Sequence, residues 1–288
     1  MLKKRVIAVI FVSQGISVQS IGFRKYLPVG RPEIAAEAFN SWGVDEIVLI
    51  DMDATQHGRL IQLSMVKKVA SKCSVPLTVG GGVKTVDDIS RLLEAGADKV
   101  FLNSEILDGG FTLKKASQKY GCQCMVGGID FLRLAEQPQV FDYRSRKTIS
   151  KSIIEVLHQY IELGCGELFV NDVGRDGSGE GFDTDLMSQV SQTASVPVIW
   201  CGGAGHPDHF LQALRVPSIS GVAAGNIFHF FEHSVNIIKS RANTEIPLRR
   251  DTQLDYLGAP LTDEGRVGKI SERVLDELLY EKLEVEII

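Results

Sequence analysis

Acidic residues stand at the ends of short apolar runs in this 288-residue chain. Asp130 follows the run Met125–Ile129, and Asp176 lies in the stretch Gly174-Arg175-Asp176-Gly177. A carboxylate at a strand end is suited to general acid–base catalysis, or it caps a loop. Capping is the commoner role of a single aspartate, whereas two carboxylates facing each other across a ligand site favour catalysis. Asp130 and Asp176 are therefore the catalytic candidates.

Glycines cluster at three further strand ends: Gly80-Gly81-Gly82, Gly202-Gly203 with Gly205, and the stretch Ala223-Ala224-Gly225-Asn226. Glycine lets an anion approach backbone N–H groups, and the N-terminus of a following helix favours negative charge. Glycines also serve tight turns, so one cluster alone decides little. Clusters at corresponding points of two halves of the chain favour two phosphate sites, which suit a ligand with a phosphate at each end.

Four charged residues, Arg5, Glu46, Lys99 and Glu167, stand where apolar runs begin. Side chains alternate along a strand, so Lys99 shares its face with Asn103. If that face lines a barrel, two cations and two anions surround the lower mouth, and they must pair because burying unpaired charge is costly. Surface charges at strand beginnings are an equally weighted alternative.

The elements that must position these residues follow from hydrophobic patterning. Short Val- and Ile-rich runs alternate with longer amphipathic stretches, which is typical of a parallel sheet with crossover helices. The predicted strands are Arg5–Phe11, Glu46–Asp51, Leu77–Val79, Lys99–Asn103, Cys124–Ile129, Glu167–Asp172, Pro197–Trp200 and Gly221–Ala224. The predicted helices include Pro32–Trp42, Gly58–Lys72, Val86–Glu94, Lys151–Leu163 and Asp183–Ala194. Eight strands, each followed by a helix, predict an α/β protein with a (β/α)₈ TIM barrel, whose functional site lies at the carboxyl ends of the strands.

An internal repeat indicates that the barrel consists of two similar halves. Four pairs of landmarks lie 121 residues apart: Glu46 and Glu167, Asp51 and Asp172, Gly82 and Gly203, and Asn103 and Ala224. Four landmarks at one offset favour a duplicated half-barrel over chance similarity. We assign residues 1–242 to the barrel and 243–288 to a C-terminal extension, in which the charged stretch 262–283 predicts one more helix.

Composition disfavours several classes of function. The formal net charge is −5 with no basic block, which disfavours nucleic acid as a partner. No apolar run approaches membrane-spanning length, so we expect a cytoplasmic protein without membrane insertion. The five cysteines lack the Cys-x-x-Cys spacing of zinc and redox sites, and we expect neither a metal nor a cofactor. Cys122 and Cys124 are expected to be buried thiols on one side of a strand.

Over roughly residues 1–240 the chain resembles the HisF family, the cyclase subunits of imidazole glycerol phosphate synthase. The motifs that carry the resemblance are Lys4-Arg5-Val6-Ile7-Ala8, Asp45-Glu46-Ile47-Val48, Val79-Gly80-Gly81-Gly82, Gly96-Ala97-Asp98-Lys99-Val100, Asn103-Ser104, Arg175-Asp176-Gly177, Gly202-Gly203-Ala204-Gly205 and Phe228-His229. The resemblance implies that a HisH-like glutaminase subunit docks under the barrel and releases ammonia into the lumen. It implies a gate formed by Arg5, Glu46, Lys99 and Glu167. It also implies that a phosphorylated small molecule is bound by Gly82, Asn103 and Ser104 in one half and by Gly177, Gly203, Ala224 and Gly225 in the other.

The catalytic pair of the family is incomplete in this chain. The second family aspartate is present as Asp130, but the first falls on Phe11, which lies 119 residues before Asp130 and so near its mate position in the repeat. Gln19 stands where the family carries a loop lysine. Phenylalanine cannot transfer a proton, and a general acid or base contributes about 10²–10⁴-fold to the rate.

A complete gate beside an incomplete catalytic pair resembles a second HisF-like branch, which is associated with surface polysaccharides. In that branch, HisF-like and HisH-like proteins supply ammonia to an ATP-dependent amidotransferase that makes an acetamidino sugar. Our leading hypothesis is an ammonia-conducting subunit of this kind. The alternatives are a working cyclase/lyase, in which Asp130 or Asp176 carries both proton transfers, and a non-catalytic scaffold. The sister isomerase of the same pathway ranks last, because it has no ammonia to conduct.

Overall fold

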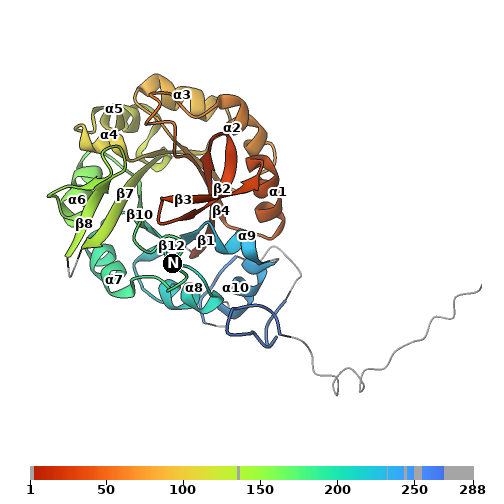
Figure 1. The fold of residues 1–288 in the computed structure, drawn as a ribbon. Coiled ribbons are helices and arrows are strands. Elements are labelled where there is room, and N and C mark those ends of the chain that lie inside the picture. Colours follow the sequence, from red (N-terminus) through yellow and green to blue (C-terminus); the bar gives the residue numbers. More distant parts are fainter. Residues whose placement is uncertain (1–2, 135–136, 232, 243–244, 250–254, 269–288) are drawn as a thin grey trace, which may run out of the picture. The chain divides into compact units, whose positions relative to one another are not determined.

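Eight parallel strands close into a barrel in the computed structural model, which describes residues 3–134, 137–231, 233–242, 245–249 and 255–268. The barrel strands are β1 (Arg5–Ser13), β4 (Glu46–Asp51), β5 (Leu77–Gly80), β6 (Lys99–Leu102), β7 (Met125–Leu134), β10 (Glu167–Asp172), β11 (Val198–Cys201) and β12 (Ile219–Ala224). Pairing of β7 with β10 and of β12 with β1 completes the ring, seen along its axis in Figure 1. The predicted (β/α)₈ TIM barrel is confirmed.

Helices surround the ring of strands (Figure 1). They are α1 (Pro32–Ser41), α2 (Leu63–Ala70), α3 (Val86–Glu94), α4 (Ser104–Leu107), α5 (Phe111–Tyr120), α6 (Ile153–Glu162), α7 (Thr184–Thr193), α8 (Pro207–Leu214), α9 (Ile227–Phe230) and α10 (Ser234–Ala242). The start of α3 illustrates how the sequence sets a boundary. Thr85 accepts a hydrogen bond from the N–H of Asp88 and the Asp88 carboxylate accepts one from the Thr85 N–H, which forms a capping box. α3 then turns Ile89 and Leu92 toward the core.

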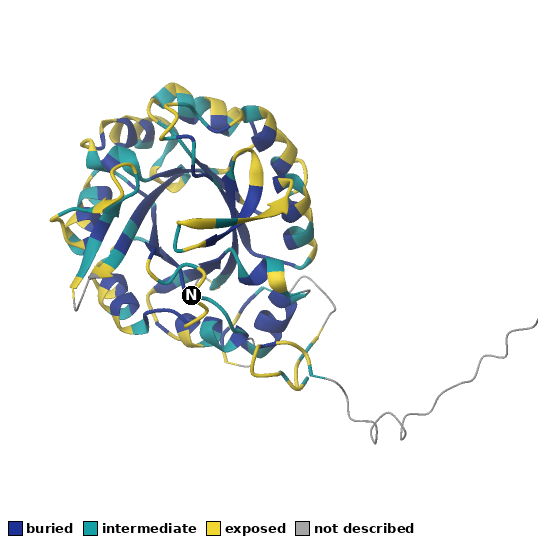
Figure 2. Cartoon of the chain, in the orientation of Figure 1, coloured by how far each residue is buried: buried dark blue, intermediate teal, exposed yellow. Residues whose placement is uncertain are grey.

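The core has two parts, because each barrel strand is buried on both faces (Figure 2). On β1, Val6, Ala8 and Ile10 pack outward against the helices, whereas Ile7 and Val9 pack into the lumen. This alternation is the period of two that a β-strand requires. The barrel is therefore filled by side chains, and any route through it passes between them.

The two halves of the barrel repeat in their packing as well as in their sequence. Asp51 ends β4 and Asp172 ends β10, and each carboxylate accepts hydrogen bonds from the backbone N–H groups two and three residues later, at 3.1 and 3.2 Å. The glycine that follows each neighbouring strand, Gly81 or Gly202, has a positive φ and lies so close to the aspartate that a Cβ would overlap it. The predicted half-barrel repeat is thus present in the tertiary structure.

Two antiparallel hairpins extend the barrel at the carboxyl ends of its strands. β2 (Ile16–Ile21) pairs with β1 and with β3 (Lys25–Gly30), and Figure 1 shows this hairpin across the mouth of the barrel. β8 (Gln137–Asp142) pairs with β7 and with β9 (Lys147–Thr148). Neither hairpin was predicted from the sequence, although both become part of the site described below.

Two predicted elements differ from the structure. The helix expected over Gly58–Lys72 begins only at Leu63, because the residues after β4 turn back on Asp51, with the Arg59 guanidinium 2.5 Å from its carboxylate. Cys122 and Cys124 lie in a short 3₁₀ helix before β7, so they do not share a strand face. Cys122 is exposed, which contradicts the expectation that it is a buried thiol.

The chain divides into two compact units, residues 1–257 and 258–288. In the first unit, α10 ends at Ala242 and Leu248 forms a parallel bridge with Lys4. In the second, the described residues 258–268 contain turns and one antiparallel bridge between Leu261 and Val267. Most of the helix predicted within 262–283 lies outside the described residues, and 262–268 are not helical.

Candidate functional site

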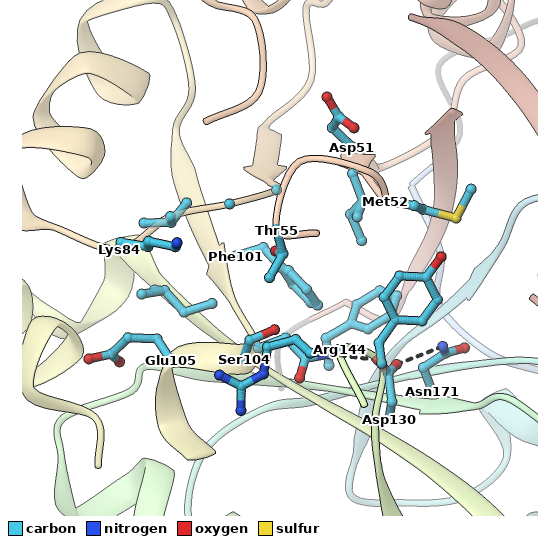
Figure 3. A pocket seen from close by; sticks show the side chains of 18 of the residues that line it. Asp51, Met52, Thr55, Lys84, Phe101, Ser104, Glu105, Asp130, Arg144 and Asn171 are labelled. Carbon is cyan, nitrogen blue, oxygen red and sulfur yellow. Dashed lines mark hydrogen bonds between the residues drawn. The ribbon is translucent and has the colours of Figure 1, made fainter. Parts of the chain in front are cut away.

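A cavity of about 460 Å³ opens at the carboxyl ends of the strands, mainly in the first half of the barrel. Phe11, Phe101 and Phe169 line it together with Asp130 and Asn171. Residues that follow the strands line it as well, among them Thr55, Lys84, Ser104 and Arg144 (Figure 3). Tyr143 lines it too. The cavity therefore combines an aromatic surface, a buried carboxylate and hydroxyl and cationic groups, as small-molecule sites commonly do.

Asp130 is held between two asparagine side chains at the edge of this cavity. Its Oδ2 accepts a hydrogen bond from Asn103 Nδ2 at 2.7 Å, and its Oδ1 accepts one from Asn171 Nδ2 at 2.9 Å (Figure 3). Burial raises the pKa of Asp130, whereas both amide hydrogen bonds oppose that rise because they stabilise the carboxylate. Asp130 thus lies where the sequence placed it, but each of its oxygens already has a donor.

Phe11 lies on the same cavity in place of a second carboxylate. It is buried and packs edge-to-face against Phe23 of the β2–β3 hairpin, with ring centroids 5.2 Å apart. Phe23 in turn packs edge-to-face against Tyr143, which follows β8, at 6.4 Å. These three rings form an aromatic wall, and a phenyl ring at residue 11 cannot exchange a proton with a ligand.

Asp176 holds the β2–β3 hairpin. Its Oδ2 accepts hydrogen bonds from Ser20 Oγ at 2.6 Å and from the Phe23 N–H at 3.1 Å, and its backbone carbonyl accepts one from the Gly22 N–H at 2.9 Å. Burial raises the pKa of Asp176 to about 6. Of the two catalytic candidates, only Asp130 lines the 460 Å³ cavity.

The seven predicted phosphate residues separate into two groups. Gly82, Asn103 and Ser104 line the cavity, whereas Gly177, Gly203, Ala224 and Gly225 do not. Several of the glycines are also required by packing. A Cβ at Gly82 would overlap the carbonyl of Arg59, one at Gly203 would overlap that of Gly181, and one at Gly177 would lie 2.7 Å from that of Ser20. Close backbone approach in these loops is therefore a second reason for glycine at these positions, and their role in phosphate binding stays a prediction.

The four charged residues at the amino ends of the strands meet in one ring of ion pairs. Arg5 Nη1 lies 2.6 Å from Glu46, and the other Arg5 nitrogen contacts Glu167. Lys99 Nζ lies 2.7 Å from Glu167 and 3.1 Å from Glu46. The alternative of separate surface charges is therefore wrong, since the glutamate side chains are only 1% and 8% exposed.

Opposite charges within the ring shift the pKa values of Glu167 and Arg5. Burial opposes ionisation of Glu167, but hydrogen bonds and charge from Arg5 and Lys99 hold its pKa below the usual value. Burial likewise opposes the charge on Arg5, yet the two glutamates keep its pKa raised. Thr78 Oγ1 donates to Glu46 at 2.7 Å, which satisfies a further buried oxygen. Each of the four side chains thus has two partners of opposite charge in the ring.

Two phenyl rings lie in the lumen between this ring and the cavity. Phe101 and Phe169 pack edge-to-face with centroids 5.5 Å apart. Two glycines make room for Phe101: a Cβ at Gly80 would lie 2.8 Å from its Cδ1, and a Cβ at Gly128 would overlap its Cζ. Side chains two residues apart on a strand share a face, so the lumen positions of Phe101, Phe169 and Asn171 could have been predicted from those of Lys99 and Glu167. No local sequence signal placed Tyr143 or Arg144 at the cavity.

Three further expectations concern a metal site, a membrane-spanning helix and Gln19. In the described part of the chain, no group of three or more histidine, cysteine, aspartate or glutamate side chains could hold a metal ion. None of the helices described is long and apolar enough to cross a membrane. Gln19, at the position of the family lysine, is buried in β2, opposite Leu27 of β3.

The chain is similar to known proteins over most of its length. A family model described as histidine biosynthesis protein matches residues 5–234. A protein of Vibrio vulnificus (strain YJ016), provisionally named imidazole glycerol phosphate synthase subunit hisF2, is 36% identical over 268 residues, which cover 90% of this chain and 98% of the relative. Imidazole glycerol phosphate synthase subunit HisF of Bacillus cereus (strain G9842) is 36% identical over 252 residues, which cover 86% of this chain and 100% of the relative.

Proposed function

The chain belongs to the histidine biosynthesis protein family and is HisF-like, and we propose that it conducts ammonia from a HisH-like glutaminase through its barrel without being an efficient cyclase. The observation that carries the proposal is Phe11, which replaces a proton-transferring group, beside the complete ring of Arg5, Glu46, Lys99 and Glu167. Loss of one acid–base group lowers a rate by about 10²–10⁴-fold. The ring, by contrast, keeps all four members.

The engagement of the two remaining aspartates supports the same conclusion. For a working cyclase, Asp130 or Asp176 would have to serve both as acid and as base. Asp130 accepts hydrogen bonds from two asparagines, and Asp176 accepts them from the β2–β3 hairpin. Asp176 does not line the cavity and would have to release the hairpin before it reached a ligand there, and the two amide hydrogen bonds to Asp130 favour its carboxylate form, which opposes its use as an acid.

The proposed route begins at the ring, passes Phe101 and Phe169, and ends beside Asp130 in the cavity. Its middle section is apolar, because Val48, Val126 and Ile199 also pack there. An isolated ammonium ion is strongly disfavoured in such surroundings, whereas neutral ammonia is not. The route therefore selects the neutral molecule.

The proposed partners follow from this route. A HisH-like glutaminase would dock where the ring opens, at the amino ends of the strands. The ammonia would leave at the opposite mouth, for a third, ATP-dependent amidotransferase that forms an acetamidino group on a surface-polysaccharide sugar. The resemblance to the second HisF-like branch supports this acceptor, and a phosphorylated small molecule would occupy the cavity.

The first test is the steady-state rate on the two-phosphate histidine precursor with added ammonium salt. We expect a wild-type rate at least about 100-fold below that of a HisF with both aspartates, and a gain of activity in Phe11→Asp. Phe11→Asn is the matched control, because it has similar size and polarity but cannot transfer the proton. Efficient turnover by the wild-type protein would instead favour the cyclase alternative.

A second test separates a conduit from a scaffold. Val126→Phe adds a third ring to the lumen beside Phe101 and Phe169. In the system reconstituted with glutaminase and acceptor enzyme, we expect this variant to lose product formation from glutamine and to keep it from ammonium salt. A scaffold would keep both reactions.

A further inference from the structure

We infer that the enzyme which accepts the ammonia docks on the two antiparallel hairpins at the mouth of the barrel, and that it presents an acidic segment with apolar side chains to them. The inference rests on the proposed function, in which ammonia leaves at this mouth for another enzyme. It adds the surface on which that enzyme lies and the chemistry of the segment that binds there.

The β2–β3 hairpin exposes apolar side chains. Ile21 on β2 and Leu27 on β3 are 41% and 49% exposed, and Val29, two residues after Leu27, is 43% exposed. By strand alternation Ile21 and Leu27 lie on the face opposite to Val18 and Tyr26, which pack toward the lumen. Among the described strands, β3 pairs only with β2, and Figure 2 shows it exposed across the mouth. Apolar side chains gathered on an exposed edge strand favour contact with another protein.

Both hairpins are also basic, although the chain as a whole has a formal net charge of −5. Neither residues 13–32 nor residues 143–151 include an aspartate or a glutamate. The first stretch carries Arg24, Lys25 and Arg31, and the second carries Arg144, Arg146, Lys147 and Lys151. Positive charge gathered in two neighbouring segments attracts an acidic partner and orients it.

Three of these cations surround a second cavity, of about 680 Å³, between the two hairpins. Arg24, Arg146 and Lys147 line it, their residues are exposed, and none of the three forms an ion pair with any residue that the structure describes. Phe23 and Tyr143 line both this cavity and the 460 Å³ cavity. An acidic segment in the second cavity would therefore lie one aromatic wall away from the point where the proposed ammonia route ends.

Contacts between the hairpins hold this second cavity in shape. The hydroxyl oxygens of Tyr26 and Tyr143 are 3.3 Å apart, and the rings of Phe23 and Tyr143 pack edge-to-face. The Arg146 guanidinium lies 5.8 Å from the centroid of the Tyr143 ring. A surface that is already formed loses little conformational freedom when a partner binds, which favours docking.

The exposed apolar side chains distinguish a protein partner from a small anion. A small anion in the second cavity would use the cations and leave Ile21, Leu27 and Val29 in water. A protein segment with aspartate or glutamate beside aliphatic side chains would satisfy both parts of the surface. Docking there would also cover the mouth, so that ammonia would pass to the acceptor without entering the solvent.

The first test measures the affinity of the full chain for the purified ATP-dependent amidotransferase by biolayer interferometry, without glutamine. Arg24→Glu combined with Lys147→Glu should weaken binding by at least about tenfold, because like charges would then meet across the interface. The wild-type affinity should fall as the salt concentration rises from about 0.05 to about 0.3 M, and the charge-reversed protein should lose most of this dependence. The matched control is Lys67→Glu combined with Lys68→Glu, which makes the same change of charge on exposed positions of α2 and should bind as the wild type does.

The apolar side chains are tested separately with Leu27→Ser, which should weaken binding by about tenfold and leave the salt dependence unchanged. Its control is Phe111→Ser, which removes a side chain of 67% exposure from α5 and should leave the affinity unchanged. Thermal unfolding of each variant at the wild-type Tm shows that the fold is kept.

The outcomes separate docking from conduction. Val126→Phe, which blocks the proposed route, should dock as tightly as the wild type. Failure of the wild type to bind the amidotransferase, or wild-type affinity in both hairpin variants, would overturn the inference and leave the ammonia route standing. Isothermal titration with ADP tests for a small-anion site: ADP binding that is lost in the charge-reversed protein, together with unchanged docking, would assign the second cavity to a small ligand and also overturn it.

Discussion

Adding a single methyl group at Gly128 should destabilise the barrel, because Phe101 occupies the space that the methyl would need. Gly128 lies on β7, faces the lumen, and has an ordinary φ, so only the contact with Phe101 opposes the change. The ring cannot swing away freely, since it also packs against Phe169 and lies close to Gly80. Overpacking of this kind costs about 1–3 kcal/mol.

The expected net effect of Gly128→Ala is a loss of about 1–2 kcal/mol in the free energy of unfolding. The overpacking cost is partly offset, because alanine restricts the unfolded chain and thereby contributes about 0.4–1 kcal/mol. For a protein of this size the loss corresponds to a Tm lower by about 2–8 °C. Urea denaturation with linear extrapolation measures it directly.

A double-mutant cycle shows whether Phe101 is the cause. Phe101→Ala alone should cost about 3–5 kcal/mol, as removal of a buried phenyl group does. In the Phe101→Ala background, Gly128→Ala should cost nothing further. The control is Gly174→Ala, where the nearest atom to the new Cβ is 3.4 Å away, and it should change stability by less than about 0.5 kcal/mol. Additive costs in the cycle, or equal effects at Gly128 and Gly174, would refute the assigned packing of the lumen.

Three further predictions concern charge and the hairpin. Burial raises the pKa of Asp176 to about 6, above the value of an unfolded aspartate, so its contribution to the stability of the fold is present below about pH 4 and is lost as the pH rises through 6. Urea titrations should therefore show that Asp176→Asn gains stability relative to the wild type over that window. Arg5→Met leaves two buried glutamates with one cation and should lower the free energy of unfolding by about 3 kcal/mol at pH 7. Because the pKa of Glu167 is lowered in the folded protein, this difference from the wild type should shrink as the pH falls below about 4. A difference that stays constant with pH would contradict the ion-pair assignment. Phe11→Ala removes the ring contact with Phe23 and should increase amide hydrogen exchange at 20–23 without affecting exchange in α6; equal exchange in both proteins would show that Phe11 does not hold the hairpin.

The strands and their ends could be read from the sequence because their signals are local. Glu46–Asp51 and Glu167–Asp172 were predicted with the bounds that the structure has. Each is a short apolar run that starts and stops with a charged residue, and the offset of 121 residues relates one to the other. The capped start of α3 was predictable for the same reason, since Thr85 and Asp88 are three residues apart.

The loops after the strands could not be predicted in this way, because distant side chains decide their course. Arg59 reaches back to Asp51, which shortens the helix expected over Gly58–Lys72. Asp176 and Asn226 bind Ser20 across more than 150 residues of sequence, and only these contacts place the β2–β3 hairpin over the mouth. No period or spacing encodes a pairing over such a distance.

By itself, the sequence determined a duplicated (β/α)₈ barrel, a phenylalanine in place of an acid at residue 11, and which four charged residues begin their strands. The tertiary structure alone decided that those four charges close into one paired ring, that Asp130 is held by Asn103 and Asn171, and that Asp176 and Asn226 hold Ser20 of the hairpin. The physical reason is that periodicity specifies which face of an element is buried, whereas the partner of each side chain depends on how the closed barrel brings its strands and loops together.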